Sequence, residues 1–362
     1  MSETIRRGAT FTRSDLVVIG GSAAGVLLAG LTRYVDLGSV TAFTCSALAV
    51  AALAALVGRS VEQLGDRFGS GATGVLQSAL GNLPELFIGI FALRAGLTNV
   101  VQAAIIGSVL GNALLVLGLA FLVGGLRHGV QRFDSERART ICVLLTLAVA
   151  ALVVPSLASY VHTPAAAHEG TLSMIVSVVL LVVFALSLPA ALRRSAPAGA
   201  AEQRHPEPIR WPLPLAIGML AAASGAAALV SDWFVNALRP AIETLHISQT
   251  FAGLVIVAVA SNAIENVVGI QLAARDQADY ALSVIINSPL QVALVLAPAL
   301  VLLSHVIGGA VLTLVFAPML VAAVALAVFT VAVAILDGQS DWLEGCALLG
   351  LYTVVAAAFW WG

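Results

Sequence analysis

The sequence predicts an all-α polytopic membrane protein with about eleven transmembrane helices, arranged as one extra N-terminal helix and two inverted five-helix repeats. The first observation is composition: 60% of the 362 residues are hydrophobic and 10% are charged, with a mean hydropathy of +1.02. Because about a quarter of the residues in soluble domains are charged, a water-soluble fold does not suit this chain. The second observation is a series of long apolar runs, and the third is an internal repeat.

An apolar run of about 20 residues is long enough to cross roughly 30 Å of hydrocarbon as a helix. We predict eleven such spans, at residues 15–34, 38–58, 72–95, 98–124, 139–160, 171–191, 213–235, 250–274, 278–304, 310–336 and 342–361. Segment 193–212, RRSAPAGAAEQRHPEPIRWP, is rich in Pro, Ala and Arg, and is predicted to be a flexible cytoplasmic linker.

The chain repeats itself at a distance of 180 residues. The shift aligns the pairs Asn82 and Asn262, Glu85 and Glu265, Gly89 and Gly269, and Ser108 and Ser288. Because each repeat holds five spans, the second enters the membrane in the opposite direction, which is typical of secondary transporters. We therefore divide the chain into an N-terminal tail and extra helix (1–37), a first repeat (38–192), a linker (193–212) and a second repeat (213–362).

Arginines predict the orientation, since cytoplasmic loops of membrane proteins carry an excess of basic residues. With the N-terminus in the cytoplasm, only Arg33, Arg94 and Arg239 of the 17 basic residues fall outside. The odd number of spans then places the C-terminus outside. We expect a multi-pass protein of the bacterial inner membrane.

Two glutamates, Glu85 and Glu265, lie well inside predicted spans. An ionisable side chain at membrane depth is costly and indicates a functional site by default. The alternative is a glutamate that is paired with arginine or kept protonated by hydrogen bonds. However, the nearest arginines, Arg94 and Arg275, lie close to span ends. The matched positions of the two glutamates in the repeat also favour function.

The residues around the glutamates have the chemistry of cation ligands. Asn82 and Asn262 each precede a glutamate by three residues, so each pair shares a helix face. Pro84 interrupts the helical hydrogen bonding and frees carbonyl groups near Gly81. Such broken backbone is tolerated at membrane depth only where it lines a cavity or is buried in protein. Carbonyl, amide and carboxylate oxygens are the ligands that Ca²⁺ prefers.

The next helix of each repeat adds polar side chains in the segments IIGSVLGN (105–112) and IINSPLQV (285–292). Ser108 and Asn112 are spaced i, i+4, and Ser288 and Gln291 are spaced i, i+3, so each pair lies on one helix face. They are either further ligands or polar contacts that pack membrane helices together.

Two carboxylates facing one cavity would balance the charge of a divalent cation. Without the cation, their mutual repulsion and desolvation favour protonation of at least one of them. Ca²⁺ and H⁺ would then compete for one anionic site, and alternating access would convert this competition into antiport. A Na⁺ or K⁺/H⁺ antiporter on the same fold is the alternative.

Other classes of function fit the sequence less well. An intramembrane enzyme is disfavoured because the chain has no His–x–x–x–His, Gly–x–Ser–Gly or Gly–x–Gly–Asp motif. A passive channel is compatible with inverted repeats but not with coupled proton movement. We expect no enzymatic activity, no cofactor and no nucleic-acid partner; the expected partners are inorganic cations, protons and the lipid bilayer.

The two repeat motifs resemble a known family. GNLPELFIGIFALRAGLTNVVQAAIIGSVLGNALLVLG resembles the first conserved repeat of the cation/proton exchangers in the Ca²⁺/cation antiporter superfamily, and SNAIENVVGIQLAARDQADYALSVIINSPLQVALVLAP resembles the second. The resemblance implies Ca²⁺/H⁺ exchange, with Glu85 and Glu265 as the central acidic ligands. The implied companions are Asn82, Asn262, Ser108, Ser288, Asn112 and Gln291, with the backbone at Gly81 and Ser261.

The resemblance also extends to residues outside the two motifs. Glu62, in SVEQLGDRFG, matches an acidic residue of the family at the cytoplasmic end of a span, and Asp232, in SDWF, looks like its repeat counterpart. Either they relay protons and shape the entrances, or they are solvated carboxylates at helix ends. The chain departs from the family at Asn266, where relatives usually have a histidine that titrates near neutral pH. This departure puts histidine-based pH gating in doubt.

Overall fold

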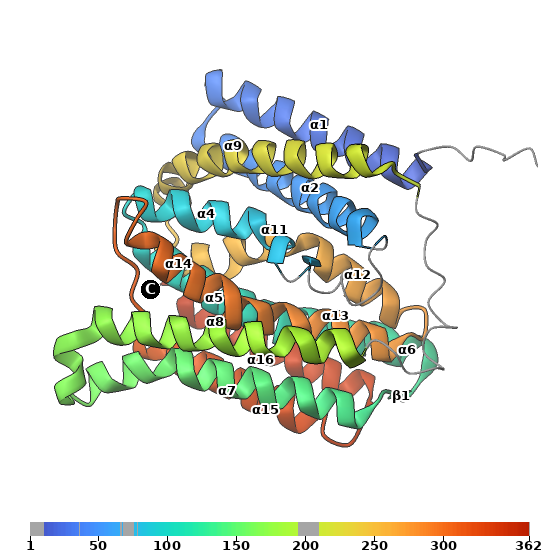
Figure 1. The fold of residues 1–362 in the computed structure, drawn as a ribbon, viewed down its shortest axis with the longest axis vertical. Helices are drawn as coiled ribbons and strands as arrows, with labels where there is room; N and C mark the ends of the chain where they lie inside the picture. Colours follow the sequence, from blue (N-terminus) through green and yellow to red (C-terminus); the bar gives the residue numbers. More distant parts are fainter. Residues whose placement is uncertain are drawn as a thin grey trace, which may run out of the picture.

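The structure is a computed structural model that describes residues 11–35, 37–65, 67, 76–77, 79–194 and 210–361. The side chains of residues 189–194, Ile264 and Glu265 lie outside the described part, as does most of the predicted linker. Within these ranges the chain is almost entirely helical, and its helices run roughly alongside one another in Figure 1. The all-helical membrane-type fold predicted from composition is therefore confirmed.

Three long helices lie together at the top of Figure 1. They are α1 (Arg13–Tyr34), α2 (Ser39–Gly65) and α9 (Leu213–Leu245), and α2 packs against both of the others. Helix α1 begins with a capping box, in which Thr12 and Asp15 each bind the backbone amide of the other. This reciprocal bonding satisfies amides that have no partner within the helix.

The middle of the molecule contains two sets of elements whose first residues lie 180 or 181 residues apart. One set is α4 (Leu83–Arg94), α5 (Thr98–Leu110), the π-helical segment η1 (Gly111–Val116) and α6 (Leu117–His128). The other is α12 (Ala263–Ala273), α13 (Ala278–Gln291), the π-helical segment η4 (Val292–Leu296) and α14 (Ala297–Ser304). The α5–α6 and α13–α14 spans are buried along most of their length.

The remaining helices form the lower part of Figure 1. They are α7 (Ser135–Tyr160), α8 (Glu169–Arg194), which follows the short 3₁₀ segment η2 (Pro164–His168), α15 (Pro318–Ala334) and α16 (Trp342–Trp360). Helix α7 packs against α8 and α15, and α16 packs against α6. Large apolar side chains on α7, α8 and α15 are exposed, as expected of helices that face lipid.

Eight described helical segments are long and apolar enough to cross a membrane, and a bent pair of helices adds a ninth candidate. The eight correspond to the predicted spans 15–34, 38–58, 98–124, 139–160, 171–191, 213–235, 278–304 and 342–361. The count of eleven stays a prediction.

Two of the predicted spans are interrupted. The span predicted at 72–95 turns at Gly81 and Asn82, and α4 begins after the turn. The span predicted at 250–274 consists of α10 (Gln249–Phe251), the π-helical segment η3 (Ala252–Val257), α11 (Ala258–Ser261) and α12, with a bend of 65° between its two halves. Both interruptions therefore lie next to the residues singled out as ligands.

The span predicted at 310–336 is wrong at its start, because residues 310–317 are not helical and α15 begins only at Pro318. The side-chain amide of Gln102 donates to two carbonyl oxygens of this segment, at 3.0 and 2.9 Å. The hydroxyl of Ser156 binds a further carbonyl and an amide, at 3.0 and 2.9 Å. These side chains satisfy the backbone without helical hydrogen bonds, and Pro318 suits the first turn of the next helix.

The loops group at the two ends of the helices. At the right of Figure 1, strand β1 (Gln131–Arg132) pairs antiparallel with β2 (Gln339–Ser340). Near it, the backbone amide of Asp134 donates to the carboxylate of Asp279 (2.5 Å). At the other end, the amide of Ala310 donates to the carbonyl of Leu93 (3.1 Å). Loops far apart in the sequence are thus brought together on two opposite sides.

Candidate cation site

The polar site lies where α4, α5 and the break between α11 and α12 meet. The break at Asn82 places Glu85 in the first turn of α4, and the break at Asn262 brings a second polar segment to the same place. The Glu85 side chain is 9% exposed, so a carboxylate is buried between apolar helices.

The two oxygens of the Glu85 carboxylate have different surroundings. Oε1 accepts hydrogen bonds from Ser108 Oγ (2.9 Å), Ser261 Oγ (3.0 Å) and Asn262 Nδ2 (2.5 Å). Oε2 is buried and has no hydrogen-bond partner among the described groups. Buried polar atoms in proteins rarely lack a hydrogen-bond partner, so Oε2 is a candidate position for a bound proton or cation.

A second set of contacts extends the site across the molecule to α13. Asn112 Nδ2 donates to the Ser108 carbonyl (3.0 Å), to Ser288 Oγ (3.3 Å) and to Asn262 Oδ1 (3.4 Å). Ser288 Oγ donates to Asn262 Oδ1 (3.3 Å). Asn112 Oδ1 is also buried without a partner in the described part of the chain. The polar residues of the two repeat motifs are therefore in direct contact.

Gly81 and Pro84 of the segment GNLPE allow the turn that precedes α4. A Cβ atom at Gly81 would lie 2.6 Å from the Gln77 carbonyl oxygen, so the turn accepts only glycine without rearrangement. Pro84 lies in the first turn, where no backbone donor is required. Asn82 is the N-cap residue, but its side chain makes no cap hydrogen bond, and its Nδ2 is buried without a partner among the described groups.

The second predicted glutamate lies outside the described side chains. The backbone of Glu265 is in the first turn of α12, three residues after Asn262, as Glu85 follows Asn82. Gln291, another predicted ligand, is the last residue of α13 and is half-buried. The expected meeting of two carboxylates stays a prediction.

An apolar cavity reaches the site from one side. Besides Glu85, Ser108 and Ser261, its lining is apolar and comes from α4, α5, η3, η4 and α14; it includes Ile88, Ala92, Val101, Ile105, Val257 and Leu300. The cavity extends along α4 and α5 towards the turn that joins them. The sequence pattern did not single out this lining, although Ile88 and Ala92 show the i, i+4 spacing of one helix face.

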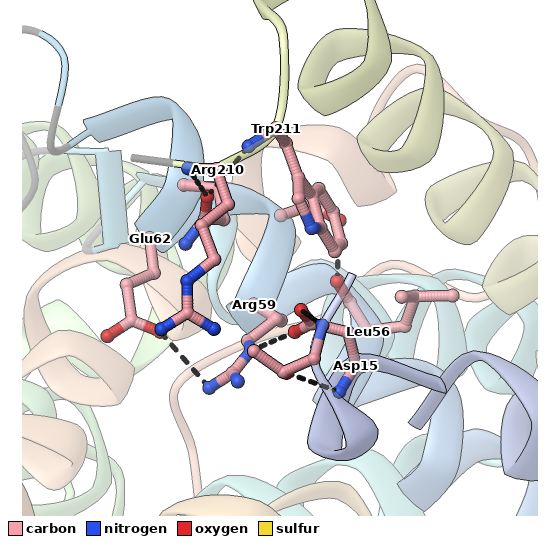
Figure 2. A network of polar contacts seen from close by, with 9 residues as sticks. Asp15, Leu56, Arg59, Glu62, Arg210 and Trp211 are labelled. Carbon is pink, nitrogen blue, oxygen red and sulfur yellow. Dashed lines mark hydrogen bonds and ion pairs between the residues drawn. The ribbon is translucent and has the colours of Figure 1, made fainter. Parts of the chain in front are cut away.

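The two carboxylates proposed as a proton pathway lie away from the Glu85 contacts. Glu62, near the end of α2, has a 47% exposed side chain and lies 3.9 Å from Arg59, which also binds Asp15 of α1 at 2.9 Å (Figure 2). Asp232 is half-buried on α9. Neither residue contacts the site directly in the described structure.

Glu62 belongs to a polar cluster that joins α1, α2 and the segment before α9. Gln63 accepts from the backbone amides of Arg210 (3.2 Å) and Trp211 (3.3 Å). Arg67 donates to the Trp211 carbonyl, and the Trp211 ring is buried against apolar side chains of α2 and α9. Asp15 and Trp211 carry no local sequence signal, because only the tertiary fold brings them to the end of α2.

The chain is similar to known proteins over most of its length. The family described as sodium/calcium exchanger protein matches residues 38–192 and 215–361. The Ca(2+)/H(+) antiporter of Aphanothece halophytica is 34% identical over 347 residues, which cover 91% of this chain and 92% of the relative. The Ca(2+)/H(+) antiporter ChaA of Bacillus subtilis is 35% identical over 340 residues, covering 93% and 97%.

A solved structure shows the same fold. The structure of native YfkE superposes with a TM-score of 0.81 at 32% sequence identity, and the match covers 95% of this chain and 99% of that chain. The likeness therefore includes the helices on both sides of the Glu85 site.

Proposed function

The chain belongs to the sodium/calcium exchanger protein family, and we propose that it is a secondary active transporter that exchanges Ca²⁺ for H⁺ across the membrane. The Ca(2+)/H(+) antiporters that it resembles match over more than nine-tenths of their length. Exchange proceeds by alternating access to a site near the midplane, where Glu85 and Glu265 hold either cation or proton. No catalytic chemistry is needed for this function.

The carboxylate of Glu85 carries the proposal. An ionised carboxylate buried without compensation is strongly disfavoured, so it must bind a proton or a cation. Three donors hold Oε1 in place, while Oε2 is buried without a partner among the described groups. The fixed carboxylate can therefore exchange one cargo for the other at Oε2 without moving its anchor.

Neutral oxygens around Glu85 supply the further ligands that Ca²⁺ requires, since this ion takes six to eight oxygen ligands. The unpartnered Oδ1 of Asn112 is one such oxygen, and serine hydroxyls can turn from donors into acceptors. The proposed ligand set comprises Glu85, Glu265, Asn82, Asn262, Ser108, Ser288, Asn112, Gln291 and the backbone at Gly81 and Ser261. Glu265 would add the second negative charge from the equivalent turn of α12.

We propose the inverted repeat as the architecture that carries the site. In its support, α4 and α12, and likewise α5 and α13, begin 180 residues apart, and both α5 and α13 continue through a π-helical segment. The loops also group by side as the predicted topology requires: Ser248 donates to the carbonyl of Trp360 at the end opposite to β1. On the excess of arginines near β1, we propose that this end faces the cytoplasm and that the C-terminus lies outside.

We further propose that the apolar cavity is one access route to Glu85, and that it leads to the outer side. Its lining follows α4 and α5 towards the turn at 95–97, which the arginine pattern places outside. Glu62, near the cytoplasmic end of α2, and Asp232, on α9, would relay protons or shape the entrances to the site. Their positions outside the Glu85 contacts predict an influence on pH dependence rather than on cation binding.

Transport by purified protein in lipid vesicles tests the proposed function. An imposed pH gradient should drive Ca²⁺ into the vesicles, and Ca²⁺ added without a gradient should move protons in the opposite direction. If Na⁺ moves protons and Ca²⁺ does not, the chain is a monovalent cation/proton antiporter on the same fold. Cation movement without proton movement would remove the antiport proposal.

A further inference from the structure

A groove runs between α7 and α15 on a surface away from the Glu85 site. Arg139, Val143 and Leu147 line it from α7, and Ala332 and Leu336 line it from α15 and the residues just after it. Val143, Leu147 and Leu336 are exposed, so the groove is open to the surroundings of the helices. Both helices belong to the apolar part of the molecule that faces lipid.

The dimensions of the groove match one leaflet of a bilayer. Arg139 is the first residue of the predicted span 139–160, which places it near the surface of the hydrocarbon. Leu147 follows Arg139 by eight positions, which corresponds to about 12 Å along the helix axis. One leaflet of hydrocarbon is about 15 Å thick, half of roughly 30 Å. A lipid acyl chain with its headgroup at Arg139 therefore fits the length of the groove.

The positive charge at the Arg139 end of the groove favours an anionic headgroup. Among the described residues of the lining, Arg139 alone is charged, and it forms no ion pair with any described residue. Arg127, Arg132 and Arg137 at the same end of the molecule likewise have no described acidic partner. An arginine guanidinium binds phosphate through two parallel hydrogen bonds.

We propose that this groove binds an anionic phospholipid, with its phosphate at Arg139 and one acyl chain against Val143, Leu147 and Leu336. The arginines place the groove in the cytoplasmic leaflet, where anionic lipids and basic pockets between helices meet. Ala332 is a small residue in the lining, which leaves room for the chain between the two helices. This lipid site is independent of the cations that the protein transports.

Native mass spectrometry of the full-length protein in neutral detergent tests the proposal. The protein is titrated with phosphatidylglycerol and, separately, with phosphatidylcholine carrying the same acyl chains. We expect tighter binding of phosphatidylglycerol, and Arg139→Gln should weaken it by about fivefold, the effect of one arginine near an anionic lipid. Ala332→Phe should reduce binding of both lipids because the ring fills the groove.

Arg137→Gln is the matched control, because Arg137 lies on the same helix two residues away but does not line the groove. It should leave the binding of phosphatidylglycerol nearly unchanged. If Ala332→Phe does not fold, Val143→Trp replaces it as the obstructing variant. Equal binding of the two lipids, or equal loss in Arg137→Gln and Arg139→Gln, would overturn the proposal. So would a multimer that Ala332→Phe dissociates, since a second copy would then occupy the groove.

Discussion

Replacing Glu85 by glutamine tests the central residue of the proposed site with little change in size. The wild-type side chain is 9% exposed and is held by three donors at 2.5–3.0 Å, so the site cannot relax easily around the change. Removing one partner of a buried charge pair typically costs about 3–5 kcal/mol, because the other charge is left uncompensated. This corresponds to a loss of at least about a hundredfold in apparent Ca²⁺ affinity.

The assay is Ca²⁺ uptake into vesicles under an imposed pH gradient, measured over a range of Ca²⁺ concentrations. Glu85→Gln should show no exchange at concentrations that saturate the wild type, while its melting temperature and elution as a folded protein remain. Glutamine can still accept hydrogen bonds from Ser108, Ser261 and Asn262 through its own oxygen, so a folded variant is expected. Normal exchange by the folded variant would refute the role of this carboxylate.

Glu265, Glu62 and Ser156 can be tested in the same way. Glu265→Gln should also abolish exchange in folded protein, and wild-type turnover would exclude the two-glutamate site. Glu62→Gln should shift the pH dependence of uptake more than its maximal rate, because this side chain is 47% exposed and its ion pair with Arg59 is long, at 3.9 Å; an unchanged pH profile would contradict this role. Ser156→Ala removes two hydrogen bonds to segment 310–317 and should lower the free energy of unfolding by about 2–6 kcal/mol, since each buried group left unpaired costs about 1–3 kcal/mol. Its melting temperature should fall, whereas Thr353→Ala, which loses a bond within its own exposed helix turn, should melt like the wild type.

Several features of the site could be predicted because membrane insertion restricts where polar residues can lie. Glu85 stood out as a charge inside an apolar run, and the 180-residue repeat identified Asn262, Ser108 and Ser288 as its companions. The structure places Ser108 and Asn262 on the carboxylate itself and Ser288 in the adjoining contacts. Composition and hydropathy also predicted the helical membrane-type fold.

Other features depended on contacts that no local pattern encodes. A hydropathy window cannot distinguish a helix from the non-helical segment 310–317, because both are apolar. Gln102, Ser156 and Ser173 approach from three other helices and, together with Ser304, hydrogen-bond the backbone of this segment in place of helical bonds. The groove at Arg139 also depends on tertiary packing, because its second wall comes from residues nearly two hundred positions later in the chain.

The sequence alone determined which residue types lie at the site. The segments GNLPE and SNAIE each place an amide and a carboxylate three residues apart, in a chain with few other charged residues. The tertiary structure decided which atoms meet. It brings Ser261 and Asn262 of one motif onto Glu85 of the other, and it leaves Oε2 buried without a described partner. The physical reason is that spacing along a helix sets the face on which a residue lies, whereas its partner across the interface depends on how the helices pack.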